Sequence, residues 1–133
     1  MHRIVYLERE SIRAEVRRPA FAHEWTEYAR TTAAQLEERL AGASIAIVNK
    51  LPISGALMAR LPQLKMVAVA ATGTNNVDLE AARRQGIVVS NIQGYAVHTV
   101  PEHVFSLLLA LSRNLLAYRQ SVAEGRWQRA EQF

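Results

Sequence analysis

The sequence contains no cysteine, which excludes a disulfide scaffold, a thiolate metal site and a cysteine nucleophile. Long hydrophobic runs are also missing: Leu107–Leu111 is far shorter than the roughly 20 residues that a membrane-spanning helix needs. Charged residues follow Met1 closely, so no export signal is visible. Neither G-x-G-x-x-G nor G-x-x-x-x-G-K occurs, and no two glycines are separated by one residue. These absences favour a cytoplasmic protein without the usual loop for a nucleotide phosphate.

The composition is that of a globular chain with a small surplus of positive charge. Half of the 133 residues are hydrophobic, enough for a real core, and the formal net charge is +4. The arginines are spread along the chain, and the densest basic stretch, Arg13–Arg18, is interrupted by Ala14, Glu15 and Val16. No zinc spacing or glycine–aromatic repeat accompanies it, so the charge does not favour a nucleic-acid partner.

Strand and helix signals alternate along the first two thirds of the chain. Ser44–Val48 and Met66–Ala71 are apolar at nearly every position, as in strands covered on both faces. The sequence therefore predicts an α/β domain with an open parallel sheet and helices on both faces. The other expected strands are Arg3–Leu7, Ile87–Val89 and a short edge strand at Thr26–Ala29, with Phe21–Trp25 irregular and Glu8–Arg18 a solvated helix or loop; the expected helices are Ala33–Leu40, Ser54–Arg60 and Leu79–Gln85.

The last third of the chain predicts one long apolar helix. Thr99-Val100-Pro101-Glu102 matches a capping box with proline in the first turn, and the helix is expected to run from Glu102 to about Ala123. Its apolar residues lie on nearly all sides, so one sheet cannot bury them and another domain or subunit is expected to cover the rest. The tail, Gly125–Phe133, is predicted to be a connection to a further part of a protein.

One turn is the best candidate for a ligand site. Thr72-Gly73-Thr74 follows the strand Met66–Ala71, and open parallel sheets bind ligands at the carboxyl ends of their strands. Successive backbone N–H groups there could bind an anion, and Lys50 is expected at the same edge. The alternative is that Gly73, Asn75 and Asn76 only satisfy a tight turn, since glycine and asparagine tolerate left-handed backbone, and that Lys50 is an ordinary solvated lysine.

The histidines near the long helix do not indicate chemistry. His98 and His103 are separated by a proline, and no carboxylate lies at relay spacing. Neither a metal site nor a catalytic base is predicted, and a capping or packing role is favoured.

Four blocks of the sequence occur in a characteristic order: Leu61–Val67, Ala71–Asp78, Val89–Tyr95 and Thr99–Val104. Together they resemble the D-isomer-specific 2-hydroxyacid dehydrogenases, most closely the glycerate dehydrogenase or hydroxypyruvate reductase branch. The resemblance extends from the first strand to Trp127 and Phe133, and each block is specific only as part of the series.

The resemblance implies a flavodoxin-like substrate-binding domain, residues 1–98, followed by a hinge and dimerisation helix, residues 99–133, that leads to a nucleotide-binding domain. It implies that the backbone of Thr72, Gly73 and Thr74 holds the carboxylate of a small 2-oxo or 2-hydroxy acid. The remaining implied site residues are Asn49 and Lys50 beside that carboxylate, and Thr99 and Val100 near the nicotinamide of NAD or NADP.

The same resemblance implies what the chain does not carry. The family's phosphate-binding glycines and its catalytic arginine, glutamate and histidine would all lie beyond Phe133, so no catalytic residue is assigned here. We expect the isolated chain to bind no cofactor tightly, to show no turnover, and to form a homodimer through the helix after Thr99. The alternative is a stand-alone small-anion-binding or dimerisation module without catalysis, and a reading frame that stops after Phe133 would favour it.

Overall fold

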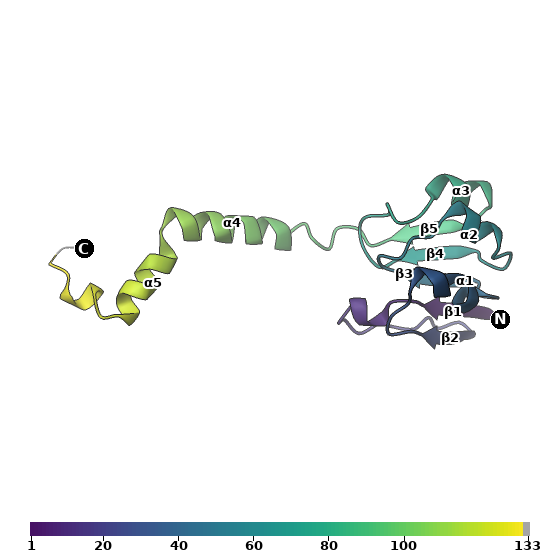
Figure 1. Ribbon diagram of the computed structural model, residues 1–133, viewed down its shortest axis with the longest axis horizontal. Helices are drawn as coiled ribbons and strands as arrows, with labels where there is room; N and C mark the ends of the chain where they lie inside the picture. The colour runs from purple at the N-terminus through teal and green to yellow at the C-terminus, as the bar shows by residue number, and fades with distance from the viewer. Residues whose placement is uncertain (132–133) are drawn as a thin grey trace. The chain divides into compact units, whose positions relative to one another are not determined.

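The computed structural model describes residues 1–131, and the first unit of the chain, Met1–Gln93, is built on a five-stranded sheet. All four strand pairings are parallel, and the strand order is β2-β1-β3-β4-β5 (Figure 1). The predicted open parallel sheet is therefore confirmed. The strands are β1 (His2–Tyr6), β2 (His23–Glu27), β3 (Ile45–Val48), β4 (Met66–Val69) and β5 (Val88–Asn91).

Short helices connect these strands, and local signals set their ends. Asp78 caps α3, since its carboxylate accepts a hydrogen bond from the backbone N–H of Ala81 at 2.9 Å, and Ser54 caps α2 in the same way. Gly42 and Gly86, which follow α1 and α3, have left-handed φ angles of 73° and 69°. The helical segments of this unit are α1 (Leu36–Leu40), α2 (Gly55–Ala59), α3 (Leu79–Arg84) and the 3₁₀ turns η1 (Arg9–Ser11) and η2 (Ala33–Gln35).

One face of the sheet forms the main core. The buried side chains of all three α-helices belong to a single cluster with alternate residues of the strands, among them Val48 and Val67. On the opposite face Ile47 and Ala68 are only half-buried, and no α-helix of Met1–Gln93 covers them. The prediction of helices on both faces is therefore wrong for this unit. An apolar strand pattern shows that both faces can be buried, but it does not show what buries them.

One predicted segment in the first unit differs from the structure, and another agrees with one of its two predicted alternatives. The edge strand is present, but β2 begins at His23, so Phe21–Trp25 is not irregular throughout. Parallel pairing with β1 supplies the hydrogen bonds for these residues, and their polar sequence gave no strand signal. The segment Glu8–Arg18, predicted to be a solvated helix or a loop, is a loop that contains the short η1 turn.

The second unit begins at Gly94 and contains two helices instead of one. These are α4 (Thr99–Ser112) and α5 (Leu115–Ala123), and the break between them lies at Asn114, whose φ of 51° is left-handed. Neither helix buries any of its residues. A 3₁₀ turn, η3 (Trp127–Arg129), follows Gly125, and the end of the tail that was predicted to be a connection lies outside the described residues.

The predicted capping box at the start of α4 is wrong. The residue that precedes the helix is His98, which makes no capping hydrogen bond through its side chain. Helical hydrogen bonds already begin upstream, because the N–H of Val100 bonds to the carbonyl of Ala96 at 3.2 Å. Thr99 therefore has helical backbone and cannot act as the cap. Pro101 does lie in the first turn, as predicted.

No helix among residues 1–131 is long and apolar enough to cross a lipid bilayer.

Candidate functional site

The candidate site lies where the loops after β3 and β4 meet at one edge of the sheet. An isolated parallel bridge joins Ile53 to Val77. Within it, the N–H of Ile53 donates to the carbonyl of Asn76 at 2.8 Å, and the N–H of Asp78 donates to the carbonyl of Ile53 at 3.0 Å. The two loops are therefore hydrogen-bonded to each other, and this places Asn49 and Lys50 on the same edge as the Gly73 turn.

The Gly73 turn presents backbone donors that the described chain leaves open. Within residues 1–131, no group accepts a hydrogen bond from the N–H of Thr72, Gly73 or Thr74. Thr72 and Gly73 are exposed and Thr74 is half-buried, so a ligand can reach them. Three successive open N–H groups are a suitable arrangement for an anion such as a carboxylate.

The alternative explanation of this turn, that its residues only satisfy a tight turn, invoked left-handed backbone, and that reason is wrong. Neither Gly73, Asn75 nor Asn76 has a positive φ angle. A β-carbon placed on Gly73 would instead lie 3.1 Å from Oδ1 of Asn75, which is closer than usual. A side chain at position 73 would therefore be close to the exposed Asn75 side chain, and left-handed backbone is not the reason for glycine here.

The backbone of the other two predicted residues, Asn49 and Lys50, is already occupied. The carboxylate of Glu8 accepts the N–H of Asn49 at 2.7 Å and that of Lys50 at 3.0 Å. The Lys50 side chain is exposed and makes no polar contact with residues 1–131, and the half-buried Asn49 side chain makes none either. Only these side chains, and not the backbone amides, are available to a ligand.

Two asparagine side chains link the Gly73 turn to neighbouring segments by hydrogen bonds. The Nδ2 of Asn76 donates to the carbonyl of Leu51 at 3.0 Å, and the Nδ2 of Asn91 donates to the carbonyl of Thr72 at 2.7 Å. Reasoning from the sequence did not identify Glu8 or Asn91. A carboxylate directly after the first strand was the one signal that could have pointed to Glu8.

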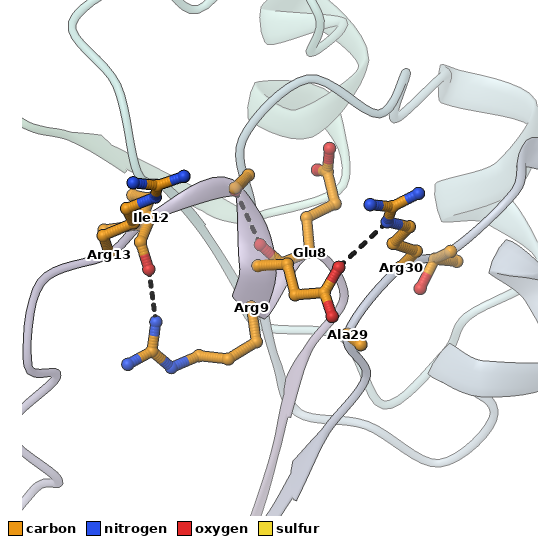
Figure 2. Close-up of a pocket in the computed structure, with 9 residues that line it drawn as sticks. Glu8, Arg9, Ile12, Arg13, Ala29 and Arg30 are labelled. Atoms are coloured by element: carbon orange, nitrogen blue, oxygen red, sulfur yellow. Dashed lines mark hydrogen bonds and ion pairs between the residues drawn. The ribbon is translucent and has the colours of Figure 1, made fainter.

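A pocket of about 870 Å³ lies beside this edge, at the ends of β1 and β2. Figure 2 shows Glu8 in it, between Arg9 and Ile12 on one side and Arg30 on the other. The Arg9 guanidinium donates to the carbonyl of Ile12, and Arg30 pairs with Glu10 at 2.9 Å. Because most of its charges are already engaged, the pocket offers an anion less than the open amides at Gly73.

Tyr6, at the end of β1, is the residue whose acidity is perturbed. Burial raises the pKa of its phenol above the ordinary value, and the neighbouring Arg9 guanidinium opposes this. The phenol is therefore neutral around pH 7.

The residues of this chain do not fit the phosphates of a dinucleotide. A pyrophosphate needs closely spaced glycines between a strand and a helix. Gly73 and Gly94 are the glycines at such positions, and each stands singly in its turn. Thr99 and Val100 are exposed in the first turn of α4, in the second unit. Within residues 1–131, no three acidic or histidine side chains are grouped as a metal site.

The fold and the site together define an α/β domain with open backbone donors at the carboxyl edge of a parallel sheet, the edge where such sheets bind ligands. Comparison with known proteins gives the family. The family model for the catalytic domain of D-isomer-specific 2-hydroxyacid dehydrogenases matches residues 5–126, and the chain belongs to this family.

Individual relatives agree with this assignment. The chain is 49% identical over 132 residues to a glycerate dehydrogenase of Methylorubrum extorquens, covering 98% of this chain and 42% of that protein. It is 35% identical over 104 residues to a hydroxypyruvate reductase of Blautia hydrogenotrophica, covering 76% of this chain and 32% of that protein. The chain thus spans less than half the length of these relatives.

The fold agrees with that of solved structures. An acyclic imino acid reductase, solved in complex with NADPH and D-arginine, superposes with a TM-score of 0.72 at 21% identity, covering 98% of this chain and 42% of that one. At this identity the likeness concerns the fold alone.

Proposed function

We propose that this chain is the substrate-binding part of an NAD(P)-dependent D-2-hydroxyacid dehydrogenase that reduces a 2-oxo acid such as hydroxypyruvate or glyoxylate in the cytoplasm. In this proposal residues 1–98 belong to the substrate-binding domain, and residues 99–133 form the hinge and the start of the connection to a nucleotide-binding domain. The observation that carries it is the set of open N–H groups at Thr72, Gly73 and Thr74. Membership of the family and the similarity to a glycerate dehydrogenase support it.

The proposed role of the site is binding and orientation. A carboxylate that accepts hydrogen bonds from the backbone N–H groups of Thr72, Gly73 and Thr74 is fixed without a charged side chain. Asn49 and Lys50 lie on the same edge, where the Lys50 ammonium adds attraction for an acid. Holding the acid by its carboxylate directs its 2-oxo carbon toward the reacting partner, which is a contribution of positioning.

The cofactor belongs to a part of the protein other than the described residues. When bound, NAD or NADP supplies or takes up the hydride at the C2 carbon of the acid. Thr99 and Val100 are proposed as neighbours of its nicotinamide, whereas the phosphates have no fitting turn in this chain. The chain alone is therefore expected to bind the cofactor weakly and to contain no catalytic residue.

Titration of the ¹⁵N-labelled 133-residue chain with hydroxypyruvate tests this proposal. The amide resonances of Thr72, Gly73 and Thr74 are expected to shift in a saturable way, because these groups become hydrogen-bonded to the carboxylate. Hydroxyacetone, which lacks the carboxylate, is the matched control and should shift none of them. The same chain should not oxidise NADH in the presence of hydroxypyruvate. Turnover, or a lack of shifts at the Gly73 turn, would contradict the proposal.

The second proposed partner is another copy of the chain, bound through α4. This helix carries apolar side chains on nearly all sides and buries none, and Leu108 and Leu111 are 53% and 76% exposed. We expect light scattering to find a dimer, and the double variant Leu108→Glu/Leu111→Glu to be monomeric, since two carboxylates would be buried in the interface. Leu79→Glu, at a 48% exposed position of α3, is the matched control and should remain dimeric. A monomeric unaltered chain at high concentration would rule out this interface.

A further inference from the structure

Glu8 lies directly after β1 and reaches across to the loop after β3. Its carboxylate accepts hydrogen bonds from three successive backbone N–H groups: Oε2 from Asn49 at 2.7 Å, from Lys50 at 3.0 Å and from Leu51 at 3.2 Å, with Oε1 also 3.2 Å from the N–H of Lys50. A carboxylate held by several amides is a strong, charge-assisted contact. The chain thus fills this set of neighbouring amides with an anion of its own.

The loop that Glu8 holds is in turn bonded to the Gly73 turn. Glu8 accepts the N–H groups of residues 49–51, and two carbonyls of the same segment bond to Asn76. Its Nδ2 donates to the carbonyls of Asn49 and Leu51, at 3.5 and 3.0 Å. The backbone of Asn76 bonds to Ile53 just beyond that loop. A continuous path of hydrogen bonds therefore runs from the Glu8 carboxylate to the segment that carries the open amides of Thr72, Gly73 and Thr74.

We propose that Glu8 is a positioning residue of the substrate site, an inference that rests on the proposed function. It has two effects. It fixes the loop after β3, and through Asn76 it fixes the Gly73 turn in the geometry that binds a carboxylate. It also occupies the amides of Asn49, Lys50 and Leu51, so that a substrate carboxylate binds at the Gly73 turn and not at this neighbouring set.

The test compares the unaltered 133-residue chain with Glu8→Ala by titrating ¹⁵N-labelled protein with glyoxylate and, separately, with acetate. In Glu8→Ala, affinity for glyoxylate at Thr72–Thr74 is expected to fall about tenfold, the lower end of the loss seen in metal sites when a residue that orients a metal ligand is removed. Because the neighbouring amides are then open, acetate should shift the resonances of Asn49, Lys50 and Leu51. A residue that only stabilised the fold would not make these three amides respond to acetate.

Two further variants complete the design. Glu10→Ala removes the nearest acid on the same segment, which pairs with Arg30 on the surface, and it should leave the affinity and the three amides unchanged. Glu8→Gln keeps the length of the side chain and one neutral acceptor oxygen, so it should fold even if Glu8→Ala does not and should lose less affinity.

The outcomes separate the inference from the proposed function. If the unaltered chain shows no glyoxylate shifts at Thr72–Thr74, the proposed function fails and the role of Glu8 falls with it. If these shifts occur but both Glu8 variants keep the unaltered affinity, only the positioning role is overturned. Loss of affinity in Glu8→Gln and Glu8→Ala, with acetate shifts at Asn49–Leu51 in the alanine variant, would support it.

Discussion

Replacement of Gly73 by alanine should weaken binding of hydroxypyruvate by about 10- to 100-fold while changing the free energy of unfolding little. The new β-carbon would lie 3.1 Å from Oδ1 of Asn75, in the space beside the open amides. A hydrogen bond to a charged group contributes about 1.5–3 kcal/mol, and each 1.4 kcal/mol corresponds to a factor of ten in affinity. Displacing the carboxylate from one amide therefore gives a loss of this size.

Stability should be nearly unaffected because Gly73 has no positive φ angle, and the Asn75 side chain is exposed and can move aside. Gly86→Ala is the matched control. Its φ of 69° is left-handed and a β-carbon there meets no atom within 4 Å, so it should lose about 1–2 kcal/mol of stability and keep its affinity. Isothermal titration calorimetry and urea unfolding measure the two quantities. A Gly73→Ala chain that binds hydroxypyruvate with unaltered affinity would show that the carboxylate lies elsewhere.

Much of the fold could be predicted from the sequence because its signals are local. In the structure Asp78 and Ser54 cap helices, and Gly42 and Gly86 follow helix ends; each of these residues acts within one turn. The strands β3 and β4 were found from apolar runs, and the parallel pairing of the sheet followed from the alternation of strands with helices.

Contacts between distant segments could not be predicted in this way. Glu8 and Asn49 are 41 residues apart, and no pattern in one sequence announces that a carboxylate will be bonded to a particular loop. The break at Asn114 was also missed, because the apolar pattern continues across it and only the left-handed backbone interrupts the helix. The Gly73 turn could be predicted because its position directly after a strand is a local signal. That its backbone N–H groups have no acceptor could be learned only from the hydrogen bonds of the three-dimensional structure.

A substitution in the core is expected to have as large an effect as one at the site, but on the free energy of unfolding and not on the affinity for the ligand. Leu40 is fully buried at the end of α1, in the cluster that includes Val48 and Val67. Leu40→Ala removes buried side-chain volume and leaves a cavity, so it should lower the free energy of unfolding by about 2–5 kcal/mol. Leu79→Ala, at a 48% exposed position of α3, is the matched control and should change it by about 0.5 kcal/mol or less.

The fluorescence of Trp25, in β2, can follow urea unfolding of the sheet-containing unit when Trp127, in the second unit, is replaced by phenylalanine in all variants. The folded fraction of Leu40→Ala should bind hydroxypyruvate with the affinity of the unaltered chain. The reason is that the Leu40 side chain is buried in the core on the helix-covered face of the sheet and forms no hydrogen bond with the loops of the candidate site. Leu40→Ala would then lower the free energy of unfolding and leave the affinity for hydroxypyruvate unchanged, whereas Gly73→Ala would do the reverse. This contrast separates residues that stabilise the fold from residues that bind the ligand. If Leu40→Ala lowered the free energy of unfolding by less than about 1 kcal/mol, α1 would not be packed into the core. If the variant also lost affinity for hydroxypyruvate, ligand binding at the edge of the sheet would depend on core packing as well as on the hydrogen bonds of the loops.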